Sequence, residues 1–288
     1  MAAPQPANEN PSGLPVSAGR SNLTLRILSS LVLAPLAIAA AYFGGVGFMA
    51  FWAIAALIVL WEWDTLVCAQ DRNSVLATGA AVLVGAALLL ALGRPGVAIA
   101  LIALGSLAVA ALASNVRRLW CAAGLVYAAA ILIAPVLLRH DESLGFAAIL
   151  FLFVIVWLTD ITADFVGRAV GGPKLMPRVS PNKTWSGAVG GTVAAVIGGV
   201  IVAMQFGIAG LVSVAAIALV LSVVSQAGDL AESAIKRRLG AKDASQLIPG
   251  HGGLMDRLDG FVAAAAAGAL IGLVQGGFDA PARGLMVW

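Results

Sequence analysis

Long apolar runs recur along this chain, and they restrict its fold more than any other feature of the sequence. Each run is about 20 residues long, the length at which an α-helix spans the hydrocarbon core of a bilayer. Backbone polar groups in lipid must be satisfied within the segment, so continuous apolar runs indicate helices, whereas transmembrane β-strands alternate. We place the runs at residues 24–43, 46–66, 74–92, 96–113, 119–138, 143–163, 186–207, 209–228 and 259–277. The sequence therefore predicts an all-α, polytopic integral membrane protein with about nine transmembrane helices.

Charged residues are too few for a water-soluble fold of this size. Of the 288 residues, 61% are hydrophobic and 11% are charged, whereas soluble domains carry about 25% charged residues. Residues 1–22 are rich in proline and small polar residues, and we predict that they form a disordered tail. If this tail is cytoplasmic, every lysine and arginine of the chain except Arg94, Arg139 and Arg283 falls in a cytoplasmic segment. Because cytoplasmic loops carry an excess of positive charge, the sequence predicts a cytoplasmic N-terminus.

Several small residues within the apolar runs have structural rather than chemical interpretations. Cys68 and Cys121 lie in or beside apolar runs and lack the spacing of a metal motif. We interpret them as small buried apolar residues and expect neither a disulfide framework nor a zinc site. Gly187 and Gly191 form a G-x-x-x-G pair, which we interpret as a site of close helix packing.

The carboxylates that could perform chemistry are concentrated in residues 228–260. Asp229, Glu232 and Lys236 are spaced three and four residues apart, so they share one face if the preceding helix continues. Acidic residues at the end of an apolar span are costly without partners, and a cation is one such partner. Asp256 and Asp259 open the last apolar run and again share a helix face. Two carboxylates at this spacing form a hard oxygen site that suits Mg²⁺.

A glycine-rich segment and a second polar stretch accompany these carboxylates. The segment Pro249-Gly250-His251-Gly252-Gly253 would let backbone N–H groups approach phosphate oxygens. The second stretch, residues 160–185, holds Asp160 and Asp164, and basic residues follow around a turn predicted at residues 180–184. The excess of positive charge in cytoplasmic loops explains the basic residues but not the aspartates. We expect this stretch to form the other wall of a site whose carboxylates, Mg²⁺ and cationic side chains are typical of phosphoryl or nucleotidyl transfer.

The spacing of these residues resembles that of a known family, the phosphatidate cytidylyltransferases, also called CDP-diacylglycerol synthases. The resemblance covers roughly residues 157–261 and departs from the family pattern at Asp164, Ser186 and Gly260. Its most specific part reads Ser233, Lys236-Arg237, Lys242-Asp243, Pro249-Gly250-His251-Gly252-Gly253 and Asp256-Arg257-Leu258-Asp259.

The resemblance implies an enzyme that transfers CMP from CTP to phosphatidic acid, giving CDP-diacylglycerol and pyrophosphate for phospholipid biosynthesis. Residues 23–142 would then be N-terminal transmembrane helices, and residues 143–288 would be the catalytic transmembrane domain. The implied partners are CTP and phosphatidic acid in the bilayer, with no nucleic acid, and a homodimer is compatible with the sequence. The implied location is a bacterial-type inner membrane with the active site on the cytoplasmic face. Mg²⁺ is the expected cofactor, and a second metal ion or a monovalent cation is left open.

The resemblance also implies roles for individual residues. We expect His251 to organise its loop or contact phosphate rather than act as a base. The hypothesised metal ligands are Asp229, Asp256 and Asp259, with Asp160 and Glu232 as further ligands or their neighbours. The expected catalytic residues are Asp229, Lys236, Asp256, Arg257 and Asp259. The expected substrate-binding residues are Arg178, Ser180, Lys183, Arg237, Lys242, His251, Gly252 and Gly253.

Two other functions are weighed against this one. The first is another polytopic lipid nucleotidyltransferase or phosphotransferase, such as a lipid kinase, which would use ATP. The second is a transporter that uses carboxylates for ion coupling, in which such residues lie at mid-membrane on broken helices. In this chain most charged residues lie at the cytoplasmic boundary instead. Glu62 and Asp64, near the end of the second apolar run, are exceptions that we expect near the same face, in a structural or supporting role.

Overall fold

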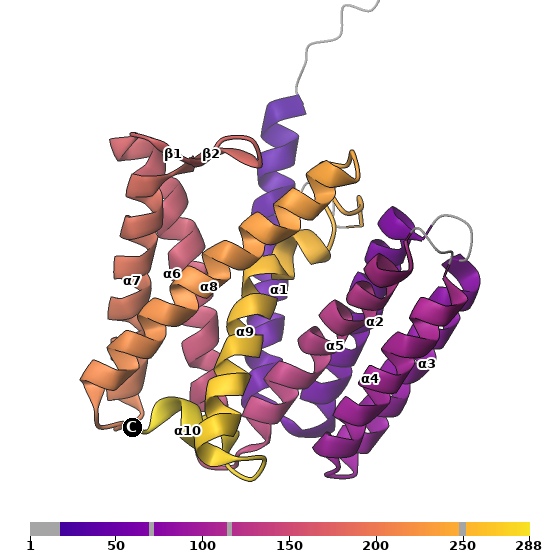
Figure 1. Cartoon of the computed structure of the whole chain (residues 1–288). Helices are drawn as coiled ribbons and strands as arrows, with labels where there is room; N and C mark the ends of the chain where they lie inside the picture. The colour runs from indigo at the N-terminus through magenta and orange to yellow at the C-terminus, as the bar shows by residue number, and fades with distance from the viewer. Residues whose placement is uncertain (1–17, 69–71, 114–116, 248–251) are drawn as a thin grey trace, which may run out of the picture.

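The computed structural model describes residues 18–68, 72–113, 117–247 and 252–288, with the backbone alone for residues 18–30. Within this part of the chain, eight helices, α2 to α9, are long and apolar enough to cross a membrane. The all-α, polytopic class is therefore confirmed. Figure 1 shows α6, α7 and α8 on one side of the bundle and α2 to α5 on the other, with α9 between them. The helices are α1 (Ala18–Phe43), α2 (Gly45–Val67), α3 (Arg72–Ala91), α4 (Pro95–Leu112), α5 (Arg118–His140), α6 (Gly145–Val170), α7 (Trp185–Gln205), α8 (Leu211–Arg238), α9 (Met255–Gly276) and α10 (Pro281–Met286).

The N-terminal helix differs from its prediction. It begins at Ala18, so the last five residues of the predicted tail, 18–22, are helical, and residues 1–17 lie outside the described residues. The last proline before the helix is Pro15, and the chain from Ala18 onward contains no further proline until Pro35. The apolar part of α1 whose side chains are described, Leu31–Phe43, is shorter than a full span. The count of nine spans and the cytoplasmic N-terminus therefore stay predictions.

Two helices extend well beyond their predicted apolar runs. Helix α6 continues to Val170 and α8 continues to Arg238, so the polar stretches after residues 163 and 228 begin as helix. Each extension stops just before a glycine in the left-handed region, Gly171 with φ 67° and Gly240 with φ 73°. The polar side chains at the start of each stretch, such as Asp164, Asp229 and Glu232, are therefore held on helices rather than on loops.

A short hairpin follows α6. Strand β1 (Lys174–Met176) pairs antiparallel with β2 (Ser180–Thr184). The predicted turn at residues 180–184 is wrong, because this segment is the second strand and the turn lies at residues 177–179. A two-stranded sheet has only edge strands, so Pro181 is tolerated in β2. Thr184 then caps α7 by accepting a hydrogen bond from the Gly187 amide at 3.1 Å.

Helices α6 and α7 pack closely along the G-x-x-x-G pair. A Cβ atom on Gly187 would lie 2.5 Å from the carbonyl oxygen of Ala163. A Cβ atom on Gly191 would lie 2.5 Å from the carbonyl oxygen of Thr159. The interpretation of these glycines as a packing site is confirmed, since any side chain would push the two backbones apart.

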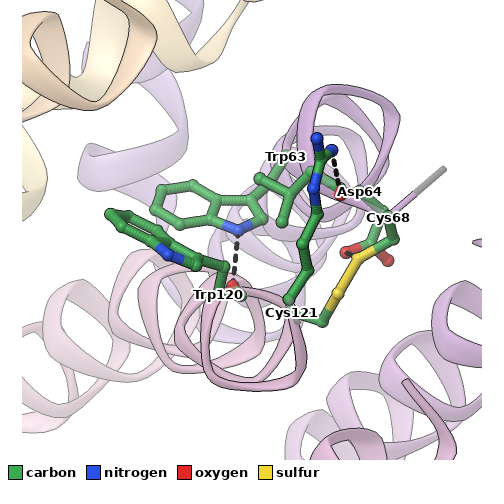
Figure 2. The surroundings of a disulfide bond; sticks show 7 residues. Trp63, Asp64, Cys68, Trp120 and Cys121 are labelled. Carbon is green, nitrogen blue, oxygen red and sulfur yellow. Dashed lines mark hydrogen bonds between the residues drawn. A yellow bond between two sulfur atoms is a disulfide. The ribbon is translucent and has the colours of Figure 1, made fainter. Parts of the chain in front are cut away.

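The end of α2 is joined to the start of α5. Cys68 and Cys121 are buried, as expected, but they form a disulfide bond, which corrects the interpretation of two separate apolar residues (Figure 2). The Trp63 indole N–H donates a hydrogen bond to the Trp120 carbonyl at 2.8 Å beside it. The two cysteines are 53 residues apart in the chain. Only the packing of α2 on α5 brings them together, so their spacing carried no signal.

Candidate active site at the polar ends of the helices

Lys236, near the end of α8, is a buried cation between two carboxylates. Its ammonium group lies 2.7 Å from a carboxylate oxygen of Glu232 and also pairs with Asp256 at the start of α9. The side chains of Lys236 and Glu232 are only 9% and 2% exposed. The predicted shared face of Glu232 and Lys236 is confirmed by this i, i+4 ion pair. Charges buried this deeply persist only when they are paired, so the three groups form one unit.

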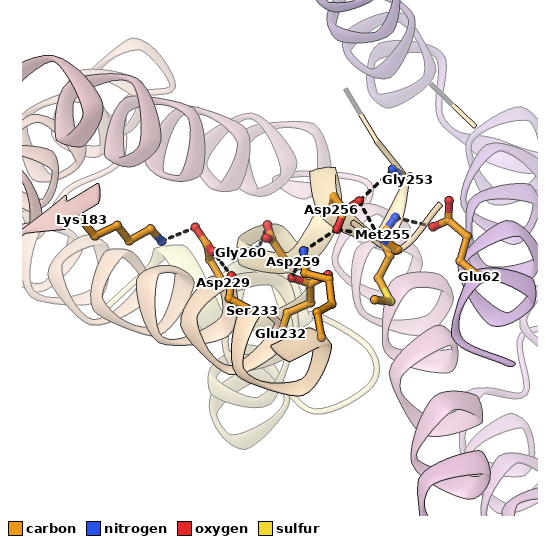
Figure 3. A network of polar contacts seen from close by, with 12 residues as sticks. Glu62, Lys183, Asp229, Glu232, Ser233, Gly253, Met255, Asp256, Asp259 and Gly260 are labelled. Carbon is orange, nitrogen blue, oxygen red and sulfur yellow. Dashed lines mark hydrogen bonds and ion pairs between the residues drawn. The ribbon is translucent and has the colours of Figure 1, made fainter. Parts of the chain in front are cut away.

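Asp256 organises the loop between α8 and α9 (Figure 3). Its carboxylate accepts hydrogen bonds from the amides of Ala244 at 2.9 Å and Gly253 at 2.8 Å. Gly252 has φ 83°, and a Cβ atom there would lie 2.8 Å from an oxygen of Asp256. Of the two described glycines in the predicted phosphate-binding segment, Gly252 is therefore required by packing against this carboxylate, whereas a Cβ atom on Gly253 would meet Glu62. The other members of that segment, His251 included, lie outside the described residues.

Asp229 connects the two polar stretches. Its carboxylate pairs with the ammonium of Lys183 on β2, and the Ser233 hydroxyl donates to it at 3.4 Å. Lys183 and Asp229 are 46 residues apart, and both side chains remain partly exposed. The expectation that residues 160–185 form the other wall of the site is supported by this contact.

Two further aspartates, Asp160 and Asp259, interact electrostatically with Asp229 of this ion pair. Asp259 on α9 interacts electrostatically with Asp229 and with Asp160, which lies on α6. Close packing of α8 against α9 brings them together, since a Cβ atom on Gly228 would lie 3.0 Å from the carbonyl oxygen of Asp259. Like charges gathered at the end of apolar helices repel one another unless a cation joins them. This arrangement favours binding of a cation.

The donor set fits Mg²⁺ chemically at some of the predicted ligands but not at all of them. Asp160, Asp229 and Asp259 supply the hard carboxylate oxygens that Mg²⁺ prefers. The buried Ser225 hydroxyl lies beside Gly260 and has no hydrogen-bond partner among the described residues. Asp256 and Glu232 fit less well, because both already pair with the buried ammonium of Lys236. Among the described residues, no three such side chains are close enough to hold an ion in this conformation.

Comparison with known proteins decides the family. The model of the cytidylyltransferase family matches residues 24–273. This chain belongs to the cytidylyltransferase family. A phosphatidate cytidylyltransferase of Brucella abortus is 47% identical over 259 residues, which cover 88% of this chain and 94% of the relative. One of Brucella suis is 46% identical over 266 residues, covering 91% of this chain and 97% of the relative. One of Staphylococcus saprophyticus is 44% identical over 127 residues, covering 43% of this chain and 48% of the relative.

The remaining predicted substrate-binding residues of this cytidylyltransferase lie on the hairpin, at the end of α8 and in the loop that follows. Arg178 is exposed in the turn of the hairpin, and Ser180 is half-buried at the start of β2. Arg237 and Lys242 are exposed at the end of α8 and in the loop that follows. Arg257, in the first turn of α9, interacts electrostatically with Asp160. These positions leave the cationic side chains accessible at the polar ends of the helices.

The three departures from the family pattern have structural explanations in this cytidylyltransferase. Asp164 forms an exposed ion pair at 2.8 Å with Arg168, one turn further along α6. The Ser186 hydroxyl donates to the carbonyl of Gly171 and so joins the start of α7 to the end of α6. A Cβ atom on Gly260 would lie 2.6 Å from the hydroxyl oxygen of Ser225, so a larger residue would not fit there without a shift.

Sequence reasoning did not give Glu62 a specific role at the site. This residue lies on α2, is fully buried, and accepts hydrogen bonds from the chain that enters α9. The available signal was a carboxylate inside an apolar run, which is costly unless it is paired. Its partners could not be named, because they lie 183 to 193 residues away.

Proposed function

We propose that this chain transfers the cytidylyl group of CTP to phosphatidic acid, forming CDP-diacylglycerol and releasing pyrophosphate. The observation that carries the proposal is the 47% identity, over 88% of the chain, to a phosphatidate cytidylyltransferase. The site supports it, since carboxylates and accessible cations meet at the polar ends of membrane-spanning helices. A lipid with a charged headgroup would reach such a place from the bilayer.

The reaction joins two anions, and the site is suited to lowering their repulsion. An oxygen of the phosphatidate phosphate forms a bond to the α-phosphorus of CTP, while the bond from that phosphorus to pyrophosphate breaks. The attacking oxygen is already negatively charged, so no strong general base is required. Lys183 and Arg257, which interact with the aspartates, and the exposed Lys242 would hold phosphate oxygens and offset the charge that develops. CTP would lie over the loop organised by Asp256.

Mg²⁺ would be held by Asp229 and Asp259, with Asp160 as a further ligand. When bound, the ion supplies positive charge to the phosphates. Lys183 and Lys236 hold the carboxylates of Asp229 and Asp256 in place through ion pairs. The main role of Asp256 is to fix the loop between α8 and α9 by accepting hydrogen bonds from its amides. A second metal ion or a monovalent cation remains compatible with this donor set.

The proposed location is the inner membrane of a bacterial-type cell, with the site on the cytoplasmic face. The support for this is the excess of lysine and arginine in the segments assigned to that face. The relatives named above are bacterial proteins. A homodimer is proposed as well, on the sequence alone.

The decisive experiment is an assay of the purified protein with CTP, Mg²⁺ and phosphatidic acid, each omitted in turn. We expect CDP-diacylglycerol and pyrophosphate in equal amounts only when all three are present. ATP in place of CTP should give no product. Formation of ADP and a phosphorylated lipid would instead identify a lipid kinase and overturn the proposal.

The metal assignment has its own matched pair of variants. Because a bound metal ion contributes several kcal/mol to such reactions, Asp259→Asn should lower turnover by about 100-fold or more. Asp164→Asn removes an exposed carboxylate on α6 that pairs only with Arg168 among the partners identified for it, and it should keep wild-type turnover. Near-normal activity of folded Asp259→Asn protein would refute Asp259 as a ligand.

A further inference from the structure

Glu62 is a buried carboxylate for which the reaction described above has no use. It lies near the end of α2 and has no exposed surface. Its oxygens accept hydrogen bonds from the Ser245 hydroxyl at 2.5 Å, the Leu254 amide at 2.9 Å and the Met255 amide at 2.7 Å. All three donors belong to the segment between α8 and the first residue of α9. Figure 3 shows Glu62 reaching this segment from a different helix.

The first turn of α9 depends on this carboxylate. The first N–H groups of a helix have no partners within it and need side chains or water to satisfy them. The residue at the N-cap position of α9, Leu254, has no side chain that can do so. Glu62 therefore caps α9 from α2, and its negative charge is favourable at a helix N-terminus.

The contact leaves little freedom to the loop. A Cβ atom on Gly253 would lie 2.6 Å from an oxygen of Glu62, so the backbone rests directly on the carboxylate. Asp256 holds the same loop from the other side through the amides of Ala244 and Gly253. Helix α2 is in turn fixed to α5 by the disulfide of Cys68 (Figure 2). The position of α2 thus determines, through Glu62, where the first turn of α9 lies. That turn carries Asp256, and Asp259 follows about one turn later.

We propose that Glu62 is a positioning residue, which sets the place and rotation of α9 so that Asp259 faces Asp229 and Asp256 faces Lys236. This inference rests on the proposed function and deepens it. Glu62 does not touch substrate; it acts through the amides of Leu254 and Met255. A residue that only stabilised the fold would change the amount of folded protein but not the kinetics of each folded molecule.

The test compares Glu62→Gln with Asp64→Asn. The glutamine keeps the size of Glu62, but its amide nitrogen cannot accept a hydrogen bond, so one side of the cap is lost. Asp64 lies two residues further along the same helix and is equally buried, but it faces Cys68 and not the α9 loop. Asp64→Asn therefore controls for the loss of a buried carboxylate from α2.

Two measurements are made on each purified protein. Hydrogen–deuterium exchange of residues 252–260 should be faster in Glu62→Gln than in the wild type and unchanged in Asp64→Asn. Turnover per folded molecule should fall about 10- to 100-fold in Glu62→Gln alone, with a higher Mg²⁺ concentration for half-maximal activity, as expected when a residue that supports metal ligands is lost. If Glu62→Gln does not fold, Ser245→Ala removes one hydrogen-bond donor from the loop side. It should change the exchange rate and the turnover in the same direction but by a smaller factor.

Three results would overturn the inference. The first is exchange and kinetics of Glu62→Gln that match the wild type. The second is faster exchange with unchanged turnover, which would make the contact structural only. The third is an equal loss of turnover in Asp64→Asn. A wild-type protein inactive with CTP and phosphatidic acid would count against the proposed function instead, and the exchange comparison would then judge the role of Glu62 by itself.

Discussion

At the scale of single residues, the site depends on charges that are stable only in each other's presence. Lys236 shows this most directly, because its buried ammonium is the common partner of Glu232 and Asp256. The desolvation of one such ion costs several kcal/mol, which is recovered only through well-placed partners. Removing the central cation therefore affects both stability and the arrangement of α8 against α9.

We predict that Lys236→Met lowers the free energy of unfolding by about 3–5 kcal/mol, as expected for breaking a buried ion pair. Turnover should fall as well, since Asp256 loses the cation that orients it. Arg238→Met is the control, because it removes an exposed cation from the same helix end. Thermal unfolding in detergent and the product assay check both variants. A Lys236→Met protein as stable as Arg238→Met would contradict the role given to this ion pair.

Asp141, between α5 and α6, gives a prediction of pH dependence. Burial alone would raise the pKa of Asp141, but hydrogen bonds outweigh burial and hold that pKa below its ordinary value of 3.8. The donors are the hydroxyl and amide of Ser143 and the amides of Leu144 and Arg283. A depressed pKa in the folded state means that the stabilisation is complete above the unfolded-state value and is lost as pH falls through the folded-state value.

We therefore predict that the unfolding temperature of the wild type falls steeply below pH of about 4. Asp141→Asn should be less stable than the wild type at neutral pH and should lose less stability on acidification. Unfolding temperatures measured between neutral pH and pH of about 3 test this difference. Parallel curves for the two proteins would show that Asp141 does not contribute.

At the scale of elements, the backbone contacts between helices fix where the site residues lie. Helix α6 carries Asp160. The carbonyl oxygen of the preceding residue, Thr159, lies directly against Gly191 of α7. The same two helices support the hairpin that supplies Lys183. A shift between α6 and α7 would therefore move one wall of the site relative to the other.

Two glycine-to-alanine substitutions distinguish the effect of this close packing on stability from the effect of the higher helix propensity of alanine. Gly191→Ala should lower the free energy of unfolding by about 1–3 kcal/mol, because its Cβ atom meets backbone that cannot move aside cheaply. Gly96→Ala, on α4, places a Cβ atom where nothing lies within 4 Å, and it should be neutral or slightly stabilising. Unfolding temperatures and turnover of both proteins check the prediction. Equal behaviour of the two variants would contradict the packing role of Gly191.

At the scale of the whole molecule, the question is which side of the membrane holds the site. The loop after α8, with Lys242, lies at the end of the bundle that carries the site, and the connection after α5, with Glu142, lies at the other end (Figure 1). Both residues are exposed. The distribution of basic residues predicts that Lys242 faces the cytoplasm.

Single cysteines in a background without Cys68 and Cys121 test this orientation. A membrane-impermeant maleimide should label Lys242→Cys in inside-out vesicles only and Glu142→Cys in right-side-out vesicles only. The two positions control for each other, since they differ in side but are both exposed. The reversed pattern would place the site outside and overturn the assignment to the cytoplasmic face.

Much of the fold class and part of the site follow from the sequence. The apolar runs indicate membrane-spanning helices because their length matches a bilayer, and eight of them are found in the described part of the chain. Glu232 and Lys236 were expected on one face because helical period alone brings residues four apart together. The apolar runs placed the ends of α6 and α8 too early, because polar residues can continue a helix until a glycine stops it, although the spacing of Glu232 and Lys236 already indicated that α8 continues.

The sequence by itself determined the membrane class, the helical spacing of the carboxylates and the motif shared with the family, since each depends on residues close together in the chain. Only the tertiary structure decided that Lys183 meets Asp229, that Asp256 holds a loop, that Glu62 caps α9 and that Cys68 is bonded to Cys121. The physical reason lies in the bilayer. Lipid tails are as apolar as the interior of the bundle, so an apolar run does not record which helix packs against which.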